Sequence, residues 1–413
     1  MADYPFIRTP QAVEELAGLL AREKIIAVDT EADSFFHYFE KLCLLQISAS
    51  RGTWLIDPLA LGEGGLDPLA PVFSDPSIRK VLHAAEYDLY VLHRHAGLKV
   101  RNIFDTMISA QLLGYAGVGL GALVERHLGI RLSKDQQRTD WSRRPLRPAQ
   151  IEYAAADVLY LIEVSGRVER ELSAKGRLEW AREEFALLEA RVWPERDSAE
   201  LGYLKIKGAK QLASQTLAVL RELYLMRDRR ARAIDRPPFK VLGNGTLLEL
   251  ATNPAQSRQT LAKRKGITEL VMRRMGQQIL EATAAGLEGP EHPPIEKIPD
   301  GSGRRHLDRR GDARLDQLKR WRKLRSEQLE LDPGVFCPNA VLEEIAAADP
   351  GSVEEMSGLG MVKGWWAREF GAECLEAGAR ANRTAPKHGE GPGAGPVRKR
   401  SRRGGRGRSR QPA

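Results

Sequence analysis

The fold class that the sequence predicts is an α/β domain with a mixed sheet flanked by helices, followed by two small all-helical bundles. Strand-like and helix-like segments alternate in the first part of the chain, whereas strand patterns nearly vanish after Gln211. A similar order of helices then occurs twice. A chain of 413 residues is also too long for one ordinary hydrophobic core, so two or three domains are expected.

Three apolar segments predict the strands of the first domain. They are EKIIAVDTE (23–31), KLCLLQISA (41–49) and GTWLIDP (52–58). The next segment, VLHAAEYDLYVLHRHAG (81–97), begins with a short apolar piece and continues at helical spacing. Further helices are predicted around 107–113 and 120–128. We expect this domain to occupy residues 1–200.

The rest of the body is predicted to be helical. LAVLRELYLMRDRRARAID (217–235) is a long amphipathic helix that ends at the turn RPP, and helices follow in 247–261 and 267–286. The same order recurs in 315–336, 339–356 and 360–378, after a linker rich in Pro, Gly and charge at 289–310. Any two small helical bundles look alike, which is the alternative. The shared order favours two repeated bundles, at 211–288 and 311–382.

Positive charge is concentrated at the C-terminus. Residues 383–413 hold ten Lys or Arg and one acid, an excess that equals the formal net charge of +9 of the whole chain. This segment cannot bury a core, so we expect a disordered basic tail. Such a tail would attract RNA through phosphate charge, and a mere solubility tail is the alternative.

Other features of the composition restrict the class of protein. A hydrophobic content of 42% and a charged content of 29% are typical of a soluble folded protein. No apolar run is long enough for a membrane span, and no secretory signal is visible. Cys43, Cys337 and Cys374 are too widely spaced for a disulfide framework or a zinc site. We therefore expect a cytoplasmic location, no membrane partner and, by default, a monomer.

Acidic residues follow the first predicted strand. Asp29 and Glu31 lie two residues apart, so both side chains would share one face of the strand. Two adjacent carboxylates repel each other, and a divalent cation such as Mg²⁺ or Mn²⁺ removes that penalty. Two exposed acids at the end of a strand are the alternative, and the spacing alone favours it.

Two later segments carry further candidates. Asp88 lies near the start of a predicted helix, where helix capping alone would explain an acid. Tyr153 and Asp157 lie four residues apart and would share one helix face, so the carboxylate can hold a metal while the phenol reaches a water beside it. Ordinary helices also carry this pair. His83, His93 and His95 support a zinc site less well than the acids support magnesium, and we interpret them as structural.

The order of these acids resembles the four-acid, tyrosine-containing branch of the 3′-to-5′ exonucleases, with matches at Asp29, Glu31, Asp88, Tyr153 and Asp157. QRTDWSRRPL (137–146) and QIEYAAADVLYL (150–161) narrow the resemblance to the ribonuclease D family. VLHAAEYDLYVL matches another motif of that family, with Ala84 where Asn, Gly or Ser is more usual. The helical repeats resemble paired HRDC modules. The resemblance covers about residues 5–380 and implies a ribonuclease H-like exonuclease domain followed by two HRDC-like bundles.

This resemblance implies an exoribonuclease that removes nucleoside 5′-monophosphates stepwise from RNA 3′ ends, with tRNA precursors and other small structured RNAs as substrates. Two divalent cations would be held, one by Asp29, Glu31 and Asp157 and the other by Asp29 and Asp88. Tyr153 would orient the attacking water, because a phenol is a poor base at neutral pH. A DNA exonuclease of the same group and a non-catalytic RNA-binding protein are the alternatives.

Side chains that contact RNA are harder to predict. Phe35, Phe36 and Tyr38 follow the first acids and are candidates for stacking on terminal bases, with simple packing equally plausible. Candidates for phosphate contact are Lys134, Arg143 and Arg144. The alternative for each is an ordinary solvent-exposed charge, which is the more frequent case for a single residue. Basic runs occur in both helical copies. They comprise Arg227, Arg229, Arg230 and Arg232 in the first, and Lys319, Arg320, Arg322 and Arg325 in the second. Trp365 and Trp366 are expected in the core.

Overall fold

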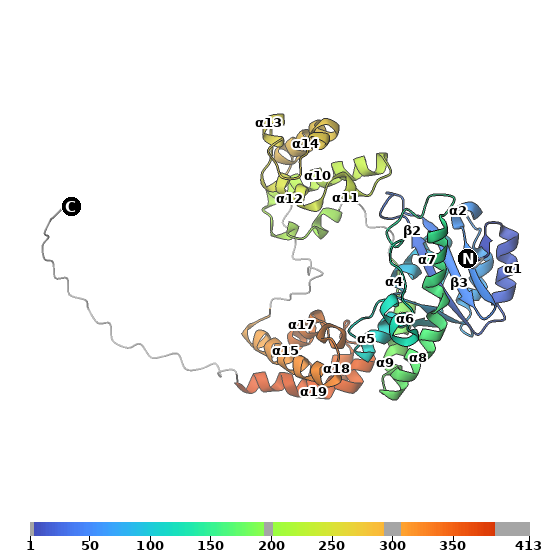
Figure 1. The fold of residues 1–413 in the computed structure, drawn as a ribbon. Coiled ribbons are helices and arrows are strands. Elements are labelled where there is room, and N and C mark those ends of the chain that lie inside the picture. Colours follow the sequence, from blue (N-terminus) through green and yellow to red (C-terminus); the bar gives the residue numbers. More distant parts are fainter. Residues whose placement is uncertain (1–3, 194–200, 293–306, 385–413) are drawn as a thin grey trace, which may run out of the picture.

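The chain forms an α/β domain and two helical bundles (Figure 1). The computed structural model describes residues 4–193, 201–292 and 307–384. The first bundle contacts the loop that follows β2 through α11 and the end of α10, and the second packs against α5 and α9. The described residues therefore have the predicted fold class.

The α/β domain is built on one mixed sheet of six strands in the order β1-β4-β3-β2-β5-β6. β2 pairs antiparallel with β3 and parallel with β5, which in turn pairs parallel with β6. The strands are β1 (Phe6–Ile7), β2 (Ile25–Ala32), β3 (Leu42–Ala49), β4 (Gly52–Ile56), β5 (Arg79–Leu82) and β6 (Ile103–Asp105). The three predicted strands are β2, β3 and β4. β1 and β6 were not predicted, because two or three residues are too few to show alternation.

Helices cover both faces of this sheet (Figure 1). Ile26 and Val28 of β2 pack with residues of α1 and α4, whereas Ala27 faces the other side, among residues of α5, α8 and α9. α7 lies against β2, β3 and β4. The helices are α1 (Pro10–Leu20), α2 (Pro58–Leu61), η1 (Asp67–Leu69), α3 (Ala70–Ser74), α4 (Glu86–Ala96), α5 (Thr106–Leu113), α6 (Leu120–Leu128), α7 (Pro148–Leu159), α8 (Leu161–Ala174) and α9 (Leu178–Glu189).

The first helical bundle has a core of its own. Its long helices α10 and α14 pack along each other, and α12 packs across α10. Tyr203, Ile206 and Ala209, which precede residue 211, also belong to this core. Its elements are η2 (Gly202–Lys205), η3 (Ala209–Gln211), α10 (Ser214–Ala233), α11 (Pro238–Val241), α12 (Asn244–Thr252), α13 (Arg258–Leu261) and α14 (Glu269–Glu288).

The second bundle shares one continuous core with the α/β domain. Trp365 stacks on Trp180 of α9, with ring centroids 4.7 Å apart and an interplanar angle of 19°. Glu184 of α9 accepts hydrogen bonds from the Trp365 indole at 2.8 Å and from Lys363 Nζ at 2.6 Å. The helices are α15 (Arg309–Leu329), α16 (Pro333–Phe336), α17 (Asn339–Ala348), α18 (Val353–Ser357) and α19 (Gly364–Thr384). Trp365 and Trp366 are buried, as predicted.

The two bundles repeat a detailed arrangement as well as an order of helices. Arg227 donates to the Leu242 carbonyl at 2.9 Å and to Asn244 Oδ1 at 2.7 Å. Arg322 donates in the same way to the Cys337 carbonyl and to Asn339 Oδ1, both at 2.8 Å, across the same chain separations of 15 and 17 residues. These two arginines tie the long helix to the start of the following helix. Burial of Arg227 argues against a phosphate contact for this residue, whereas phosphate contact by the half-buried Arg322 stays a prediction.

Other expectations can be compared with the described residues. All three cysteines are buried and form no disulfide. In the part of the chain that the structure describes, no helix is both long and apolar enough to cross a membrane. Helix α19 continues to Thr384, beyond the expected start of the tail at residue 383. Residues 385–413 of the predicted tail lie outside the described residues, as do residues 293–306 of the predicted linker.

Candidate active site

Asp29 and Glu31 lie at the carboxyl end of β2. Because side chains alternate along a strand, both share the face that carries Ala27, toward α7 and α8. Their cross-strand neighbours on β3 are Gln46, opposite Asp29, and Leu44, opposite Glu31. The register shifts between Glu31 and Ala32, so the strand pairing changes directly after the second acid.

α7 supplies Asp157 and Tyr153 to the same place. Pro148 opens this helix, and Gln150 Oε1 accepts a hydrogen bond from the Arg147 backbone N–H at 3.1 Å, which helps to fix where the helix begins. One turn separates Tyr153 from Asp157, so both side chains share one face of the helix, and the nearby Asp157 charge contributes after burial to raising the pKa of Tyr153. Carboxylate oxygens of Asp29, Glu31 and Asp157 all lie within 4.8 Å of one another.

Asp88 approaches from the opposite face of β2. It lies in the first turn of α4, and its Oδ1 accepts a hydrogen bond of 2.5 Å from the Thr30 hydroxyl. Thr30 separates Asp29 from Glu31, so this contact places Asp88 at the end of β2 beside the acids. Asp88 is buried but lies outside the group of three carboxylates. Its negative charge nevertheless raises the pKa of Asp29.

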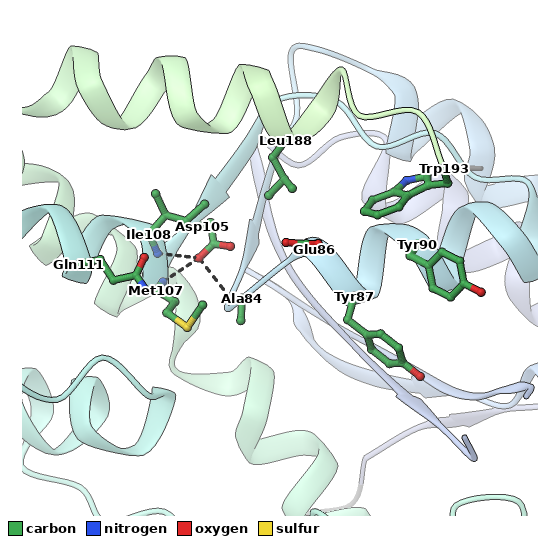
Figure 2. Close-up of a pocket in the computed structure, with 10 residues that line it drawn as sticks. All are labelled: Ala84, Glu86, Tyr87, Tyr90, Asp105, Met107, Ile108, Gln111, Leu188 and Trp193. Carbon is green, nitrogen blue, oxygen red and sulfur yellow. Dashed lines mark hydrogen bonds between the residues drawn. The ribbon is translucent and has the colours of Figure 1, made fainter. Parts of the chain in front are cut away.

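The turn before α4 fixes where Asp88 lies. Ala84 has a left-handed backbone with φ of 59°, a conformation that costs a non-glycine residue about 1–2 kcal/mol. The Asp105 carboxylate stabilises the turn by accepting hydrogen bonds from the backbone N–H groups of Ala84 at 3.2 Å and Ala85 at 2.7 Å. It also accepts from Met107 and Ile108 at the start of α5 (Figure 2). Of the residues that the family motif more usually carries here, Asn, Gly or Ser, the left-handed backbone favours Gly and Asn.

Burial and mutual repulsion both disfavour ionised carboxylates in this cluster. The pKa of Asp29 is raised well above its usual value by burial first, and then by the charges of Asp88, Asp157 and Glu31. Burial, followed by Asp157 and Asp88, raises the pKa of Glu31. Burial also raises the pKa of Asp88 and of Asp157 to about 7. For Tyr153, burial and the neighbouring acids raise the pKa, so its hydroxyl keeps its proton and remains a donor.

This set of donors fits divalent cations. Hard carboxylate oxygens are the protein ligands that Mg²⁺ and Mn²⁺ prefer. Asp29, Glu31 and Asp157 converge without any Lys or Arg in an ion pair with them among the described residues. A cation would supply the missing positive charge and return the carboxylates to their ionised form.

The residues predicted to contact RNA lie in different places. Phe35 is 57% exposed and meets Phe239 of the first bundle edge to face, and Lys134 is exposed. Arg143 is exposed and pairs with Asp140 at 3.2 Å. Arg229 and Arg230 line a hollow between α10 and α14, far along the chain from the acids. Arg144 has a structural role, since it binds the buried Asp57 carboxylate at 2.6 Å and the Cys43 carbonyl at 2.7 Å.

A contact that the sequence did not predict links the first bundle to the loop after the acids. The Asp235 carboxylate accepts hydrogen bonds from the backbone N–H groups of Tyr38 and Phe39, at 2.9 and 3.1 Å, and contacts His37 Nδ1 at 2.7 Å. The Tyr38 hydroxyl donates to Asp228 at 3.0 Å. We call these contacts the Asp235 latch. Tyr38, a candidate for stacking on a terminal base, therefore packs against the first bundle, and its hydroxyl is bound by Asp228.

Sequence reasoning also missed Gln46 and Asp105. Gln46 is fully buried opposite Asp29, and neither atom of its side-chain amide has a partner among the described residues. A buried polar residue in the apolar segment KLCLLQISA is the only feature that points to it, and its cross-strand neighbour depends on strand register. Asp105 resembles an ordinary helix cap in the sequence, because it precedes the helix at 107–113.

Comparisons with known proteins agree with this geometry. Residues 4–173 match the family model described as a 3′-5′ exonuclease, and residues 216–283 and 311–377 each match the HRDC domain. The class of protein is thus a 3′-5′ exonuclease with two HRDC domains. Such exonucleases depend on metal ions, consistent with the cluster of acids.

Whole-chain relatives define the family. The chain is 32% identical over 354 residues to ribonuclease D of Pseudomonas paraeruginosa, covering 85% of this chain and 91% of the relative. It is 30% identical over 389 residues to ribonuclease D of Nitrobacter hamburgensis, covering 93% and 95%. The chain therefore belongs to the ribonuclease D family and is a 3′-5′ exoribonuclease.

Solved structures agree. The crystal structure of Escherichia coli RNase D, an exoribonuclease involved in structured RNA processing, matches with a TM-score of 0.69 and 27% identity. The match covers 94% of this chain and all of that chain. The catalytic core of RRP6 from Trypanosoma brucei matches with a TM-score of 0.61 and 29% identity, over 70% of this chain and 80% of that chain.

Proposed function

We propose that this exoribonuclease trims the 3′ ends of small structured RNAs, tRNA precursors among them, and releases nucleoside 5′-monophosphates with the help of two divalent cations, Mg²⁺ or Mn²⁺. One observation carries the proposal: carboxylates of β2 and α7 converge within 4.8 Å, with a fourth buried acid beside them on α4. E. coli RNase D acts in structured RNA processing, which supports the substrate class.

The four acids would divide between the two cations. Asp29, Glu31 and Asp157 would hold one cation, and Asp29 and Asp88 would hold the second. When bound, the cations supply positive charge that stabilises the attacking and leaving oxygens of the phosphodiester. The Thr30 hydroxyl keeps the Asp88 carboxylate at the end of β2 by donating to it.

Tyr153 is proposed to orient the attacking water. Its hydroxyl keeps its proton because burial and the nearby acids raise its pKa. Tyr153 and Asp157 lie one turn apart on the same face of α7, so a water held by that carboxylate would lie within reach of the phenol. The ring is fixed by Trp141, whose centroid lies 6.0 Å away.

A tRNA precursor with extra 3′ nucleotides tests the substrate. The full chain is incubated with this RNA in Mg²⁺ and, separately, in Mn²⁺, and the products are resolved on a gel and by chromatography. We expect 5′-monophosphates and a product that ends at the mature 3′ end, with a matched DNA strand degraded at least tenfold more slowly. Equal rates on DNA, or products with a 3′-phosphate, would contradict the proposal.

Further features remain proposals of ours. We propose a monomer. We also propose a cytoplasmic location, which the three buried cysteines without a disulfide support. The domain boundaries at 1–200, 211–288 and 311–382 also stay predictions. Among the predicted RNA contacts, Phe35, Lys134, Arg143, Arg229 and Arg230 are partly or fully accessible, which supports keeping them as candidates.

A further inference from the structure

A second hollow lies at the same edge of the sheet as the catalytic acids. It is a cavity of about 490 Å³ beside the carboxyl ends of β5 and β6, which run parallel to β2. Ligands of α/β sheets bind outside the carboxyl ends of parallel strands. Its walls are largely apolar and aromatic (Figure 2). Residues that line it include Tyr87, Tyr90, Ile108, Gln111, Leu188 and Trp193.

We propose that this pocket binds an unpaired base of the RNA strand on the 5′ side of the nucleotide being removed. Tyr87, Tyr90 and Trp193 form an aromatic row: the Tyr87 and Tyr90 centroids are 6.2 Å apart, and those of Tyr90 and Trp193 are 5.7 Å apart. Bases of single-stranded RNA stack on such rings without strong sequence preference. The proposal rests on the exoribonuclease activity and specifies how that site holds its substrate.

The row begins at the active site. Tyr87 precedes Asp88 on α4, but its side chain projects to the pocket side of the helix. Its hydroxyl contacts Ser34 at 3.3 Å and also donates to Glu40, both in the loop that follows Glu31. Tyr87 therefore lies between the catalytic acids and the pocket. A strand whose 3′ end reaches Asp88 would pass this ring first and Trp193 last.

Free positive charge borders the far end of the row. A neighbouring hollow of about 550 Å³ shares Leu188 and Trp193 with the proposed base pocket. The exposed Lys99 and Arg101 also line this neighbouring hollow. Among the described residues, neither cation forms an ion pair. Both are thus available to phosphates on the strand that leaves the pocket.

The one exposed acid of the pocket is already neutralised. Glu86 pairs with Arg191 at 2.7 Å, and the Arg191 guanidinium lies over the Trp193 indole, 5.0 Å from its centroid. This arrangement places the guanidinium against the indole and offsets the Glu86 charge that would repel a phosphate. Rings flanked by unpaired cations favour a nucleic-acid strand over an acidic or apolar peptide.

Chain length of the RNA provides the test. Hydrolysis of an unpaired decanucleotide and of a dinucleotide too short to reach the pocket is compared between the full-length protein and Trp193→Ala. For Trp193→Ala we expect the factor by which kcat/KM falls to be about tenfold larger on the decanucleotide than on the dinucleotide. The reason is that stacking of a base on one ring contributes roughly 1–3 kcal/mol. Trp193→Phe keeps a ring and should recover most of the loss.

Controls separate this outcome from misfolding. Leu187→Ala removes an exposed apolar side chain of α9, the helix that precedes Trp193, and this side chain does not line the pocket, so the variant should match the unmodified protein on both substrates. Lys99→Ala with Arg101→Ala should reduce the salt dependence of decanucleotide binding, measured in chelator to prevent hydrolysis.

An equal loss on both RNA lengths for Trp193→Ala would overturn the pocket assignment. An unchanged salt slope for the Lys99 and Arg101 variant would overturn it as well. If the unmodified protein degrades neither RNA, the proposed function fails instead. If a protein segment, and not RNA, occupies this pocket, every variant should hydrolyse both RNAs at the rate of the unmodified protein. That result would also contradict the proposal.

Discussion

Burial first, and then the charges of three other carboxylates, raise the pKa of Asp29, so the repulsion within the site is concentrated on this residue. A raised carboxyl pKa means that the folded, metal-free protein binds protons more tightly than the unfolded chain. Its stability therefore falls as pH rises from the unfolded value of about 4 through the folded values near 7. Repulsion among the four carboxylates is strongest above about pH 7, where fewer of them hold a proton.

Asp29→Asn should therefore stabilise the metal-free protein while abolishing its activity. We expect a gain on the order of 2 kcal/mol above pH 7 and a smaller gain near pH 5, where the acids are protonated. Thermal unfolding in chelator at both pH values measures it. Glu63→Gln, an exposed acid remote from the cluster, is the control. An unfolding temperature at or below that of the unmodified protein at both pH values would exclude this repulsion.

Tyr153→Phe tests the role of the phenol. We expect kcat to fall roughly 10–100-fold, because the water loses its orienting hydrogen bond, and the Kd for RNA to stay within about twofold. Single-turnover rates and binding in chelator separate the two quantities. Equal losses in rate and in binding would reject the water-orienting role.

Much of the site was predictable at this scale. The order and spacing of Asp29, Glu31, Asp88, Tyr153 and Asp157 were enough to group them, and three of them form the cluster. Gln46 was not predictable, because its position opposite Asp29 depends on the pairing of β2 with β3. The departure at Ala84 was visible, but its left-handed backbone was not.

At the scale of elements, the Asp105 carboxylate joins the turn before α4 to the start of α5. Asp105→Ala should destabilise the protein by about 2–4 kcal/mol, because it leaves several buried N–H groups without an acceptor. Asp88 would lose its fixed position, so the Mg²⁺ concentration needed for half-maximal activity should rise. Chemical denaturation and a metal titration measure the two effects.

Asp105→Asn serves as the conservative partner of that variant. Its side-chain oxygen keeps part of the acceptor set, so it should lose less stability than Asp105→Ala and require less Mg²⁺. If Asp105→Ala loses stability but keeps the metal dependence of the unmodified protein, Asp105 stabilises the fold without positioning Asp88.

Prediction of the elements themselves succeeded where a pattern was long. β2, β3, β4 and the long helix α10 follow from apolar runs or helical periodicity. The basic runs were recognised in the sequence, but the structural contacts of two of their members were not. A pattern of charge does not show that Arg227 and Arg322 donate hydrogen bonds to backbone carbonyls. A buried arginine and a phosphate-binding arginine look alike in sequence.

At the scale of the whole molecule, the two bundles are joined to the exonuclease domain by different chemistry. The second bundle shares an apolar core with α9 through Trp180 and Trp365. The first bundle keeps its own core and contacts the loop after the acids through the polar Asp235 latch and through aromatic side chains such as Phe35, which meets Phe239. Neither arrangement was predictable, since sequence patterns report single elements and not the surfaces that join them.

Breaking the Asp235 latch should loosen the loop that follows the catalytic strand. For Asp235→Ala we expect hydrogen exchange at the Tyr38 and Phe39 amides to accelerate about tenfold or more, and kcat/KM on structured RNA to fall. Asp316→Asn, an exposed acid of the second bundle, is the control. Unchanged exchange at both amides would show that the latch does not hold the loop.

The central claim is that acids from β2, α4 and α7 together form a metal-dependent exonuclease site. Its most direct test is the digestion of one RNA labelled at its 5′ end, with and without chelator, by the unmodified protein and by Asp157→Asn. We expect a ladder that shortens one nucleotide at a time, abolished by chelator and reduced at least a hundredfold by the substitution. Internal cuts, activity that survives chelation or an unaffected Asp157→Asn would contradict the account.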